Sequence, residues 1–372
     1  MPQRKKIAYI ISTIDKSLAF EWIALGLKSD YVLTFILLNP ATSVLEEFLI
    51  RNNVEVKRIL YRGKKDFIAA FCKTFLYLLF NRKQVVHAHL FDAQLIGLTC
   101  AYLVGIRKRI YTRHNSNYHH VYRPQGVWFD RWSNRMATHI ISISQATDKT
   151  LFELERVRIN KVVTIPHGFD LDVFTEVSPE RTQHIRKKWK IQKQNPVIGI
   201  IARHVEWKGI QFIIPAFQKF LIEYPTSFLV LANATGPYHD TIIKLLESIP
   251  VDRVVLIQFE EDVAALYTVF DLYIHTPVDS ICEAFGQTYV EALAASRPSI
   301  FTLSGIANEF IVHERNALVV GFKDSTDIYH AMVRLWRHPE LKRQLIENGR
   351  QDVFSRFGVA PMLASLKKLY ES

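Results

Sequence analysis

Two glutamates flank a glycine turn in residues 281–298, ICEAFGQTYVEALAASRP. Glu283 precedes Ala-Phe-Gly, and Glu291 follows eight residues later. Gly286 permits a tight turn at a helix start, where the outward N–H groups of residues 285–288 would form an anion site. Glu291 could accept hydrogen bonds from a vicinal diol, and Glu283 could meet a polar ligand from the loop. A helix cap with two solvated glutamates explains the segment alone equally well.

A second segment, residues 199–209, carries two cations behind an apolar run. Arg203 ends the run, and Lys208 follows five residues later, directly before Gly209. A planar guanidinium and a mobile ammonium at the carboxyl end of a strand suit a diphosphate. Two surface cations without a ligand are the favoured interpretation of this segment alone.

Two short segments, residues 85–92 and 111–120, hold an excess of histidines: His87, His89, His114, His119 and His120. Another, His167, follows an apolar run in the turn Pro-His-Gly. Imidazole is a common transition-metal ligand, but no HExxH or similar zinc spacing occurs, so we expect no metal site. A histidine at the carboxyl end of a strand is suited to hydrogen bonding or proton handling, and for His167 we expect a hydrogen-bonded loop residue.

These segments lie among short apolar runs that alternate with amphipathic stretches. The expected strands are residues 7–11, 32–38, 54–60, 84–88, 109–112, 139–143 and 161–165, then 197–202, 227–232, 253–257, 272–275, 299–302 and 317–320. The expected helices between them include residues 20–28, 45–52, 67–80, 94–105, 209–224, 238–248, 262–269, 287–295, 307–312, 326–337 and 340–354. Strands separated by helices indicate parallel sheets. We therefore predict an α/β fold of two doubly wound, Rossmann-like domains that face each other across a cleft.

A change of composition suggests where the two domains meet. Residues 178–195 are polar and charged, and Pro196 then leads into a new buried strand. We expect domains at 1–180 and 181–372, with the final helix packing back toward the N-terminal domain.

Composition excludes several classes of protein. The 372 residues are 49% hydrophobic and 22% charged, which is typical of a packed globular chain. Three cysteines without a CxxC pair argue against a disulfide framework and fit a reducing compartment: Cys72, Cys100 and Cys282. The basic start is followed by a short apolar run that ends at Ser12, so we expect a first strand and not an export signal. No stretch is long and apolar enough for a membrane-spanning helix.

The net charge of +11 is concentrated in one region. Residues 51–150 hold 17 Lys and Arg against 5 Asp and Glu, and such a field attracts phosphates, anionic lipid or nucleic acid. The expected helix in residues 64–83 has an apolar face with cations at both ends, which suits an anionic membrane surface. Packing on the N-terminal sheet explains that helix equally well. We expect no nucleic acid partner, because no recognised binding module occurs.

Taken together, residues 161–174, 199–209 and 281–291 resemble the retaining nucleotide-sugar glycosyltransferases of the GT-B fold, glycosyltransferase family four (glycosyl transferases group 1). That family carries an Ile-Pro-Asn/His-Gly segment before the domain linker, an Arg…Lys-Gly pair after the first strand of the second domain, and two glutamates separated by seven residues around Phe-Gly. All three occur here in that order. The similarity runs from about residue 85 to the end of the chain.

The resemblance implies roles for the residues that match these motifs. Arg203 and Lys208 would bind the donor diphosphate, Glu291 would hold the ribose hydroxyls, and Glu283 would face the donor sugar. His114 would reach the sugar from the N-terminal domain. Backbone groups that would contact phosphate or sugar belong to Phe285, Gly286 and Gln287. Because the cations would neutralise the leaving group, the resemblance implies no cofactor and no metal.

The first loop departs from the family pattern. It reads STIDKSLAFE where the family is usually rich in glycine, which lets the backbone approach the donor phosphate. Hydroxyls could replace that contact, and the candidates are Ser12, Thr13 and Ser17. Residues 231–237 also lack the usual Gly-x-Gly, and Ser296 replaces a common glycine.

The sequence therefore predicts a retaining hexosyltransferase that uses a nucleotide-diphosphate sugar, a UDP-sugar before a GDP-sugar. The expected acceptor is a glycan or a lipid-linked molecule of cell-envelope polysaccharide, lipopolysaccharide or glycolipid synthesis. We expect the protein in the cytoplasm, including the inner face of the cytoplasmic membrane. Two alternatives stay open: a nucleotide-sugar 2-epimerase of the same fold, and a non-catalytic nucleotide-sugar-binding partner.

Overall fold

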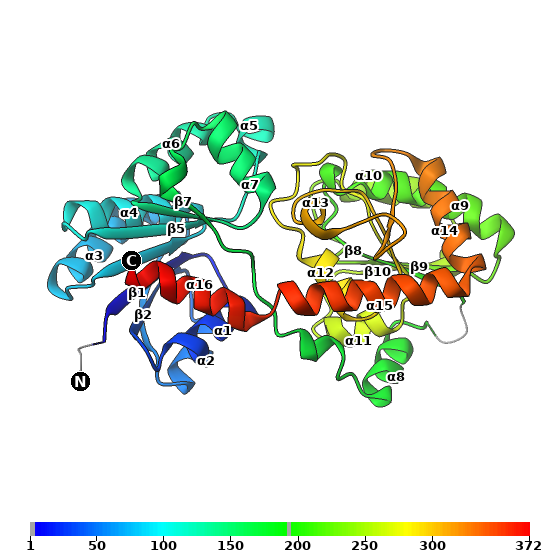
Figure 1. The fold of residues 1–372 in the computed structure, drawn as a ribbon, viewed down its shortest axis with the longest axis horizontal. Coiled ribbons are helices and arrows are strands. Elements are labelled where there is room, and N and C mark those ends of the chain that lie inside the picture. Colours follow the sequence, from blue (N-terminus) through cyan, green and yellow to red (C-terminus); the bar gives the residue numbers. More distant parts are fainter. Residues whose placement is uncertain (1–3, 192–194) are drawn as a thin grey trace. The chain divides into compact units, whose positions relative to one another are not determined.

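The computed structural model describes residues 4–191 and 195–372 and divides the chain into two compact units (Figure 1). The first unit ends at Phe169 and also includes Val359–Ser372, whereas the second unit is Asp170–Gly358. No helix within the described ranges is both long and apolar enough to cross a membrane.

The first unit is built on a seven-stranded parallel sheet with the order β3-β2-β1-β4-β5-β6-β7. Its strands are β1 (Lys6–Ser12), β2 (Val32–Asn39), β3 (Glu55–Leu60), β4 (Val85–His89), β5 (Lys108–Arg113), β6 (His139–Ser142) and β7 (Val162–Thr164). The central strands β1, β2 and β4 are buried along almost their whole length, as parallel strands covered on both faces are. Strand β3 forms one edge of the sheet, and most of its residues are exposed.

Helices cover both faces of this sheet. They are α1 (Leu18–Leu27), α2 (Val44–Arg51), α3 (Phe67–Phe80), α4 (Phe91–Leu103), α5 (Tyr118–Tyr122), α6 (Gly126–Met136), α7 (Gln145–Lys149) and α16 (Val359–Glu371). Alternate residues of β1 point to opposite faces. Tyr9 shares a core with α1, α2 and α16, whereas Ile10 shares another with α3 and α4. The final helix α16 therefore completes the first unit, and its Tyr370 is fully buried there.

The second unit repeats the design with a six-stranded parallel sheet in the order β10-β9-β8-β11-β12-β13. Its strands are β8 (Val197–Ile201), β9 (Phe228–Ala232), β10 (Val254–Ile257), β11 (Leu272–His275), β12 (Ser299–Phe301) and β13 (Leu318–Val319). Its helices are α8 (Pro179–Lys188), α9 (Ile210–Glu223), α10 (His239–Leu246), α11 (Val263–Thr268), α12 (Gln287–Ala294), α13 (Ala307–Phe310), α14 (Ser325–Arg337) and α15 (Pro339–Arg356). The predicted pair of doubly wound parallel sheets is confirmed.

The division between the units falls after Phe169, whereas the composition led us to expect it near residue 180. The short 3₁₀ turn η4 (Leu171–Phe174) already packs on the second unit, since it contacts α11 and α12 and its Phe174 ring lies 5.9 Å from that of Tyr267. Within the polar stretch that suggested a linker, Pro179–Lys188 instead form helix α8. Ser178 caps this helix by accepting the Arg181 N–H, and Pro179 occupies its first turn.

Candidate active site

The predicted cation and glutamate motifs of the second unit meet at one place on its sheet. Strands β8 and β11 are neighbours, yet the strands that follow them in the sequence, β9 and β12, lie on opposite sides. The loops that leave β8 and β11 therefore diverge, and the crevice between such loops is where doubly wound sheets bind ligands. The loop after β8 holds Lys208, and the loop after β11 holds Glu283.

Lys208 and Glu283 form a close ion pair across this crevice. The Lys208 Nζ donates to Glu283 Oε1 at 2.5 Å, and both side chains are largely shielded from solvent. Burial alone would raise the pKa of Glu283, but the Lys208 ammonium and His275 together lower the pKa to about 2. Glu283 is thus a carboxylate at any physiological pH and can serve as a hydrogen-bond acceptor.

A buried histidine lies beside this pair. His275 is the last residue of β11, is 1% exposed, and has its Nε2 3.5 Å from Glu283 Oε1. Burial lowers the pKa of His275, with Lys208 acting in the same direction and Glu283 opposing it, so the ring is neutral near pH 7. Neither ring nitrogen has a hydrogen-bond partner within the described part of the chain.

Two glycines allow the loops of the crevice to approach closely. Gly209, at φ +74°, would place a Cβ 1.9 Å from the carbonyl oxygen of Thr276, so a side chain there would separate the Lys208 loop from the end of β11. Gly286, at φ +85°, would place a Cβ 2.6 Å from the ring of Tyr289. Glycine at these positions keeps Lys208 and Glu283 within reach of each other.

The turn around Gly286 offers its backbone to a ligand. The side chain of Phe285 is buried and packs on Phe357 at 5.9 Å, so any ligand contact of Phe285 is through its backbone. Gln287 is exposed and begins helix α12, whose first N–H groups have no acceptor within the helix. The loop itself is fixed from below, because Ser304 Oγ accepts the Glu283 N–H at 3.2 Å.

Glu291 lies further along α12 and is only partly exposed. The hydroxyl of Tyr267 on α11 donates to Glu291 Oε2 at 3.0 Å. Burial raises the pKa of Glu291 to about 7, and the Tyr267 hydrogen bond only partly offsets this effect. In contrast to Glu283, this carboxyl changes its charge in the physiological range.

Arg203 is not joined to the other site residues. It follows β8 in an exposed position, and its guanidinium makes no hydrogen bond or ion pair with residues 4–191 or 195–372. A cation without a protein partner at the carboxyl end of a strand is available to an anionic ligand.

The predicted residues of the first unit lie at the carboxyl edge of its own sheet. His114 follows β5, with its Nε2 3.0 Å from His89 Nδ1 and its ring stacked 5.6 Å from that of His167. Burial lowers the pKa of His114 to about 3 and that of His167 to about 4, and the neighbouring His167 also contributes to the shift of His114. His87 uses both ring nitrogens, toward Tyr370 at 2.7 Å and Thr112 at 2.8 Å. No three His, Cys, Asp or Glu side chains of the described ranges are arranged to hold a metal ion.

The first loop keeps an unusual backbone despite its lack of glycine. Thr13 has φ +52°, and its N–H bonds the Leu38 carbonyl at 2.9 Å. A β-branched residue adopts this left-handed conformation only at a cost, whereas glycine adopts it freely. The Ser12 hydroxyl accepts the Ala93 N–H at 3.3 Å, and Ser17 precedes α1 without a side-chain cap bond. Of the three candidates, Thr13 is the exposed one.

Comparisons with known proteins agree with these features. A family model described as Glycosyltransferase Family 4 matches residues 21–173, and one described as Glycosyl transferases group 1 matches residues 181–352. The chain belongs to the group 1 glycosyltransferases. With these two matches the predicted family is confirmed.

Individual members of the group 1 glycosyltransferases are distant from this chain. Alpha-monoglucosyldiacylglycerol synthase of Acholeplasma laidlawii is 27% identical over 50% of this chain and 46% of its own length. The capsular polysaccharide biosynthesis glycosyltransferase CapM of Staphylococcus aureus is 24% identical over 80% of this chain and 79% of its own. Among solved structures, Anabaena HepE in complex with UDP and glucose has a TM-score of 0.86 and 19% identity, covering 99% of this chain and 100% of that one. The matched stretches span about half the length of the first curated relatives.

Sequence reasoning singled out the charged residues of this crevice and missed His275. A histidine that ends a strand next to the switch point is a signal, because the carboxyl ends of β8 and β11 border the crevice. The sequence alone does not show how the loop after β11 folds, so His275 could not be placed beside Glu283.

Proposed function

We propose that this group 1 glycosyltransferase moves a hexose, with retention of anomeric configuration, from a nucleotide-diphosphate donor to a glycan or lipid-linked acceptor. A UDP-sugar is the favoured donor, ahead of a GDP-sugar. The observation that carries the proposal is the shielded Lys208–Glu283 pair at the switch point of the second sheet. The complex of HepE with UDP and glucose supports the choice of donor, and the diacylglycerol and capsule relatives support the class of acceptor.

In this proposal the cations act on the leaving group. When the bond between the sugar C1 and the β-phosphate oxygen breaks, negative charge develops on the nucleotide diphosphate. In the proposal that charge is neutralised by Lys208, which is shielded in the crevice where such stabilisation is largest, and by the exposed Arg203. The first N–H groups of α12, at Gln287, add a further anion contact. We propose that these groups make a divalent metal unnecessary, and donor turnover that is unchanged by EDTA would support this point.

The two glutamates have different roles because their ionisation differs. Glu283, with a pKa of about 2, accepts hydrogen bonds from donor-sugar hydroxyls and remains ionised throughout. Glu291, with its Tyr267 partner, accepts both hydroxyls of the ribose. His114 of the first unit is a neutral imidazole that contacts the sugar.

Retention follows in the proposal from a displacement on one face of the sugar. The acceptor oxygen bonds to C1 on the side that the diphosphate leaves, and the acceptor proton passes to the departing phosphate oxygen. The first-loop groups of Ser12, Thr13 and Ser17 are assigned to donor or acceptor contacts. The free cysteines Cys72, Cys100 and Cys282 fit a cytoplasmic location, at the inner face of the membrane for a lipid-linked acceptor.

The test is binding and slow hydrolysis across a panel of UDP-, GDP- and ADP-sugars, measured by calorimetry and by release of free nucleotide. We expect one donor to bind best, and the Glu291→Ala variant to lose affinity for both that donor and the free nucleotide. Absence of donor binding across the panel would contradict the proposal. Release of an epimerised sugar without an acceptor would favour a nucleotide-sugar 2-epimerase, and binding without turnover with any acceptor would favour a non-catalytic partner.

A further inference from the structure

Helix α3 of the first unit is apolar on two sides. Its inner side packs on the sheet through the buried residues Ala70, Thr74 and Leu78, with Phe67, Phe71 and Phe75 beside them. Its outer side is also apolar, with exposed fractions of 78% for Ile68, 50% for Leu76, 43% for Leu79 and 76% for Phe80. A helix that only covers a sheet has a polar outer side, so the outer side of α3 calls for another partner.

The same layer continues this apolar surface onto α4 and α6. Helix α3 packs on α4 and α4 packs on α6 (Figure 1), and the Trp132 indole N–H on α6 bonds Thr99 on α4 at 3.0 Å. Trp128 and Trp132 stack at 5.8 Å, and Trp128 is 62% exposed. We call the exposed apolar residues of these three helices the outer face: Ile68, Leu76, Leu79, Phe80, Tyr102, Leu103, Trp128, Phe129 and Trp132.

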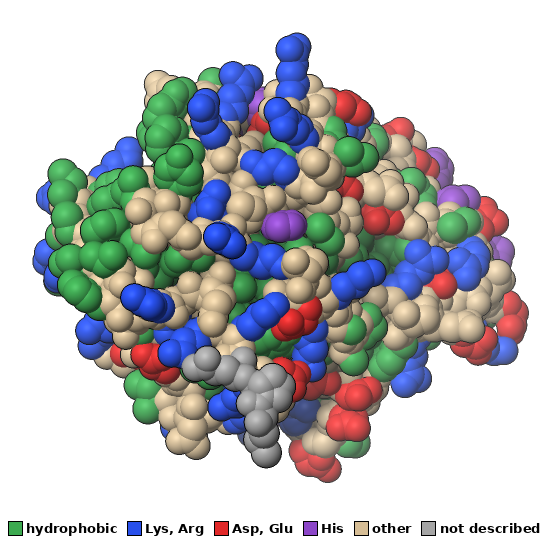
Figure 2. All heavy atoms as spheres, turned by 60° about the vertical axis from the view of Figure 1, so that its left-hand side comes forward, with side chains coloured by type: hydrophobic (Ala, Val, Ile, Leu, Met, Phe, Trp, Pro, Cys, Tyr) green, Lys and Arg blue, Asp and Glu red, His purple; other side chains and the backbone are tan. Residues whose placement is uncertain are grey.

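The outer face is surrounded by positive charge. Exposed cations on or next to its helices are Lys64, Lys65, Lys73, Arg82, Arg107, Arg131 and Arg135. Two acidic groups of the region are paired with cations, since Asp66 pairs with Arg62 at 3.0 Å and the buried Asp130 pairs with Arg113 at 2.9 Å. Figure 2 shows Lys and Arg side chains interspersed with hydrophobic ones on the side that it presents.

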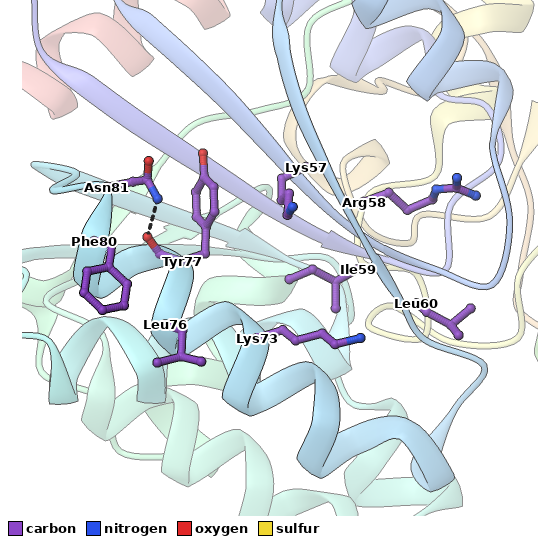
Figure 3. A pocket seen from close by; sticks show the side chains of 9 residues that line it. All are labelled: Lys57, Arg58, Ile59, Leu60, Lys73, Leu76, Tyr77, Phe80 and Asn81. Carbon is purple, nitrogen blue, oxygen red and sulfur yellow. Dashed lines mark hydrogen bonds between the residues drawn. The ribbon is translucent and has the colours of Figure 1, made fainter.

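A groove of about 460 Å³ adjoins the outer face, between the edge strand β3 and helix α3 (Figure 3). Leu60, Leu76 and Phe80 supply its apolar lining, and Lys57 and Lys73 supply exposed cations. Neither lysine forms a salt bridge or hydrogen bond with any residue that the structure describes. An apolar wall with unpaired ammonium groups suits a phosphate that is attached to a hydrocarbon chain.

We propose that the outer face and this groove bind the surface of an anionic lipid bilayer. Tryptophan and tyrosine are favoured at the boundary between headgroups and hydrocarbon, and cations beside them are attracted to the negative lipid surface. The mixture of large exposed aromatic side chains and unneutralised cations fits this boundary better than it fits the aqueous surface of a protein. The proposal concerns only the first unit and does not depend on the donor or on catalysis.

The experiment measures co-sedimentation of the full-length protein with vesicles of phosphatidylcholine, with and without phosphatidylglycerol, in the absence of any nucleotide sugar. We expect binding to the anionic vesicles that weakens as salt is raised, and little binding to neutral ones. The double variant Phe80→Ser/Trp128→Ser removes two exposed anchors, and Lys73→Glu/Arg131→Glu reverses two charges. Each is expected to reduce the partition onto anionic vesicles by about tenfold or more.

Matched controls change equivalent positions of the second unit. Phe259→Ser alters a side chain that is 77% exposed there, and Lys219→Glu/Lys244→Glu reverses two exposed lysines. These controls should bind vesicles like the unchanged protein, and circular dichroism should show that all variants are folded. Equal effects of the variants and their controls would overturn the proposal, as would the absence of binding to anionic vesicles. A concentration-dependent dimer that the Phe80→Ser/Trp128→Ser variant abolishes, without vesicle binding, would assign the outer face to a second copy of the chain instead.

Discussion

The carboxyl edges of the two sheets have the same topology, but the candidate site residues that lie there differ in charge. In the first unit His87, His89 and His114 are buried among neutral partners, and their pKa values fall far below the usual range. In the second unit Lys208 and Glu283 are shielded together, and the Lys208 ammonium lowers the pKa of Glu283 and so keeps it ionised. A buried titratable group thus stays charged only where a partner of opposite sign compensates for the loss of water.

This difference suggests a division of labour between the edges. A neutral imidazole cluster can donate to and accept from uncharged hydroxyls, as sugars offer. A cation held by a carboxylate can exchange that carboxylate for a phosphate with little change in net charge. Variants at each edge can separate these two roles.

The largest effect is expected for Lys208→Ala. Turnover of the donor should fall by two to three powers of ten, about the amount lost with one key charge-stabilising group. Glu283 would lose its compensating charge, and its pKa would rise. The measurement is steady-state release of nucleotide, with Lys219→Ala on the exposed side of α9 as the control. A loss of less than tenfold would show that the diphosphate does not rely on Lys208.

At the second edge Gly209 lies so close to the backbone of Thr276 that replacing it should cost more stability than replacing an uncrowded glycine. Gly209→Ala should lower the free energy of unfolding by about 3 kcal/mol, because its Cβ would overlap the Thr276 carbonyl. Gly105→Ala is the matched control: Gly105 also has a positive φ of +80°, but nothing lies within 4 Å of the new Cβ, so about 1 kcal/mol is expected. Calorimetric unfolding measures the loss of stability in each variant. Equal losses would mean that the positive φ sets the cost and that the contact with Thr276 adds nothing to it.

How far the sequence predicts the molecule depends on whether a feature is local. Both sheets were predictable because buried parallel strands are short apolar runs between helices. Lys208 and Glu283 could each be singled out, because their motifs have recognisable spacing around Gly209 and Gly286. The ion pair between them could not be predicted, because it depends on β8 and β11 being neighbours in the sheet. His275 lies beside Glu283 because of the way the loop between these two residues folds, and no local sequence pattern shows that path. The sequence also does not separate the two apolar sides of α3, because residues 64–83 read as a helix with one apolar face that suits either a membrane surface or the N-terminal sheet.

The neutral edge is tested by His114→Ala. If the imidazole contacts the sugar, turnover should fall by about thirtyfold, at the lower end of what one positioned polar group contributes. Affinity for the free nucleotide should not change, because the proposed function assigns that part of the donor to the second unit. For this variant, calorimetry measures the affinity for the free nucleotide, and steady-state kinetics measures the turnover of the intact donor. An equal loss in both would contradict the division of labour.

The smallest effect concerns Glu291 at the second edge, which titrates near neutrality. Burial raises the pKa of Glu291 to about 7, so the carboxyl is protonated below that pH and ionised above it. Ribose hydroxyls donate to the ionised form, and donor affinity should therefore fall about tenfold per pH unit below 7 and level off above it. An intact UDP-sugar is the right probe, because its phosphates do not titrate in this range. Glu291→Gln keeps the shape and removes the titration, so its affinity should be lower and independent of pH. If both proteins show the same slope, the titrating group is elsewhere, and the contrast between a permanently charged Glu283 and a switchable Glu291 is lost.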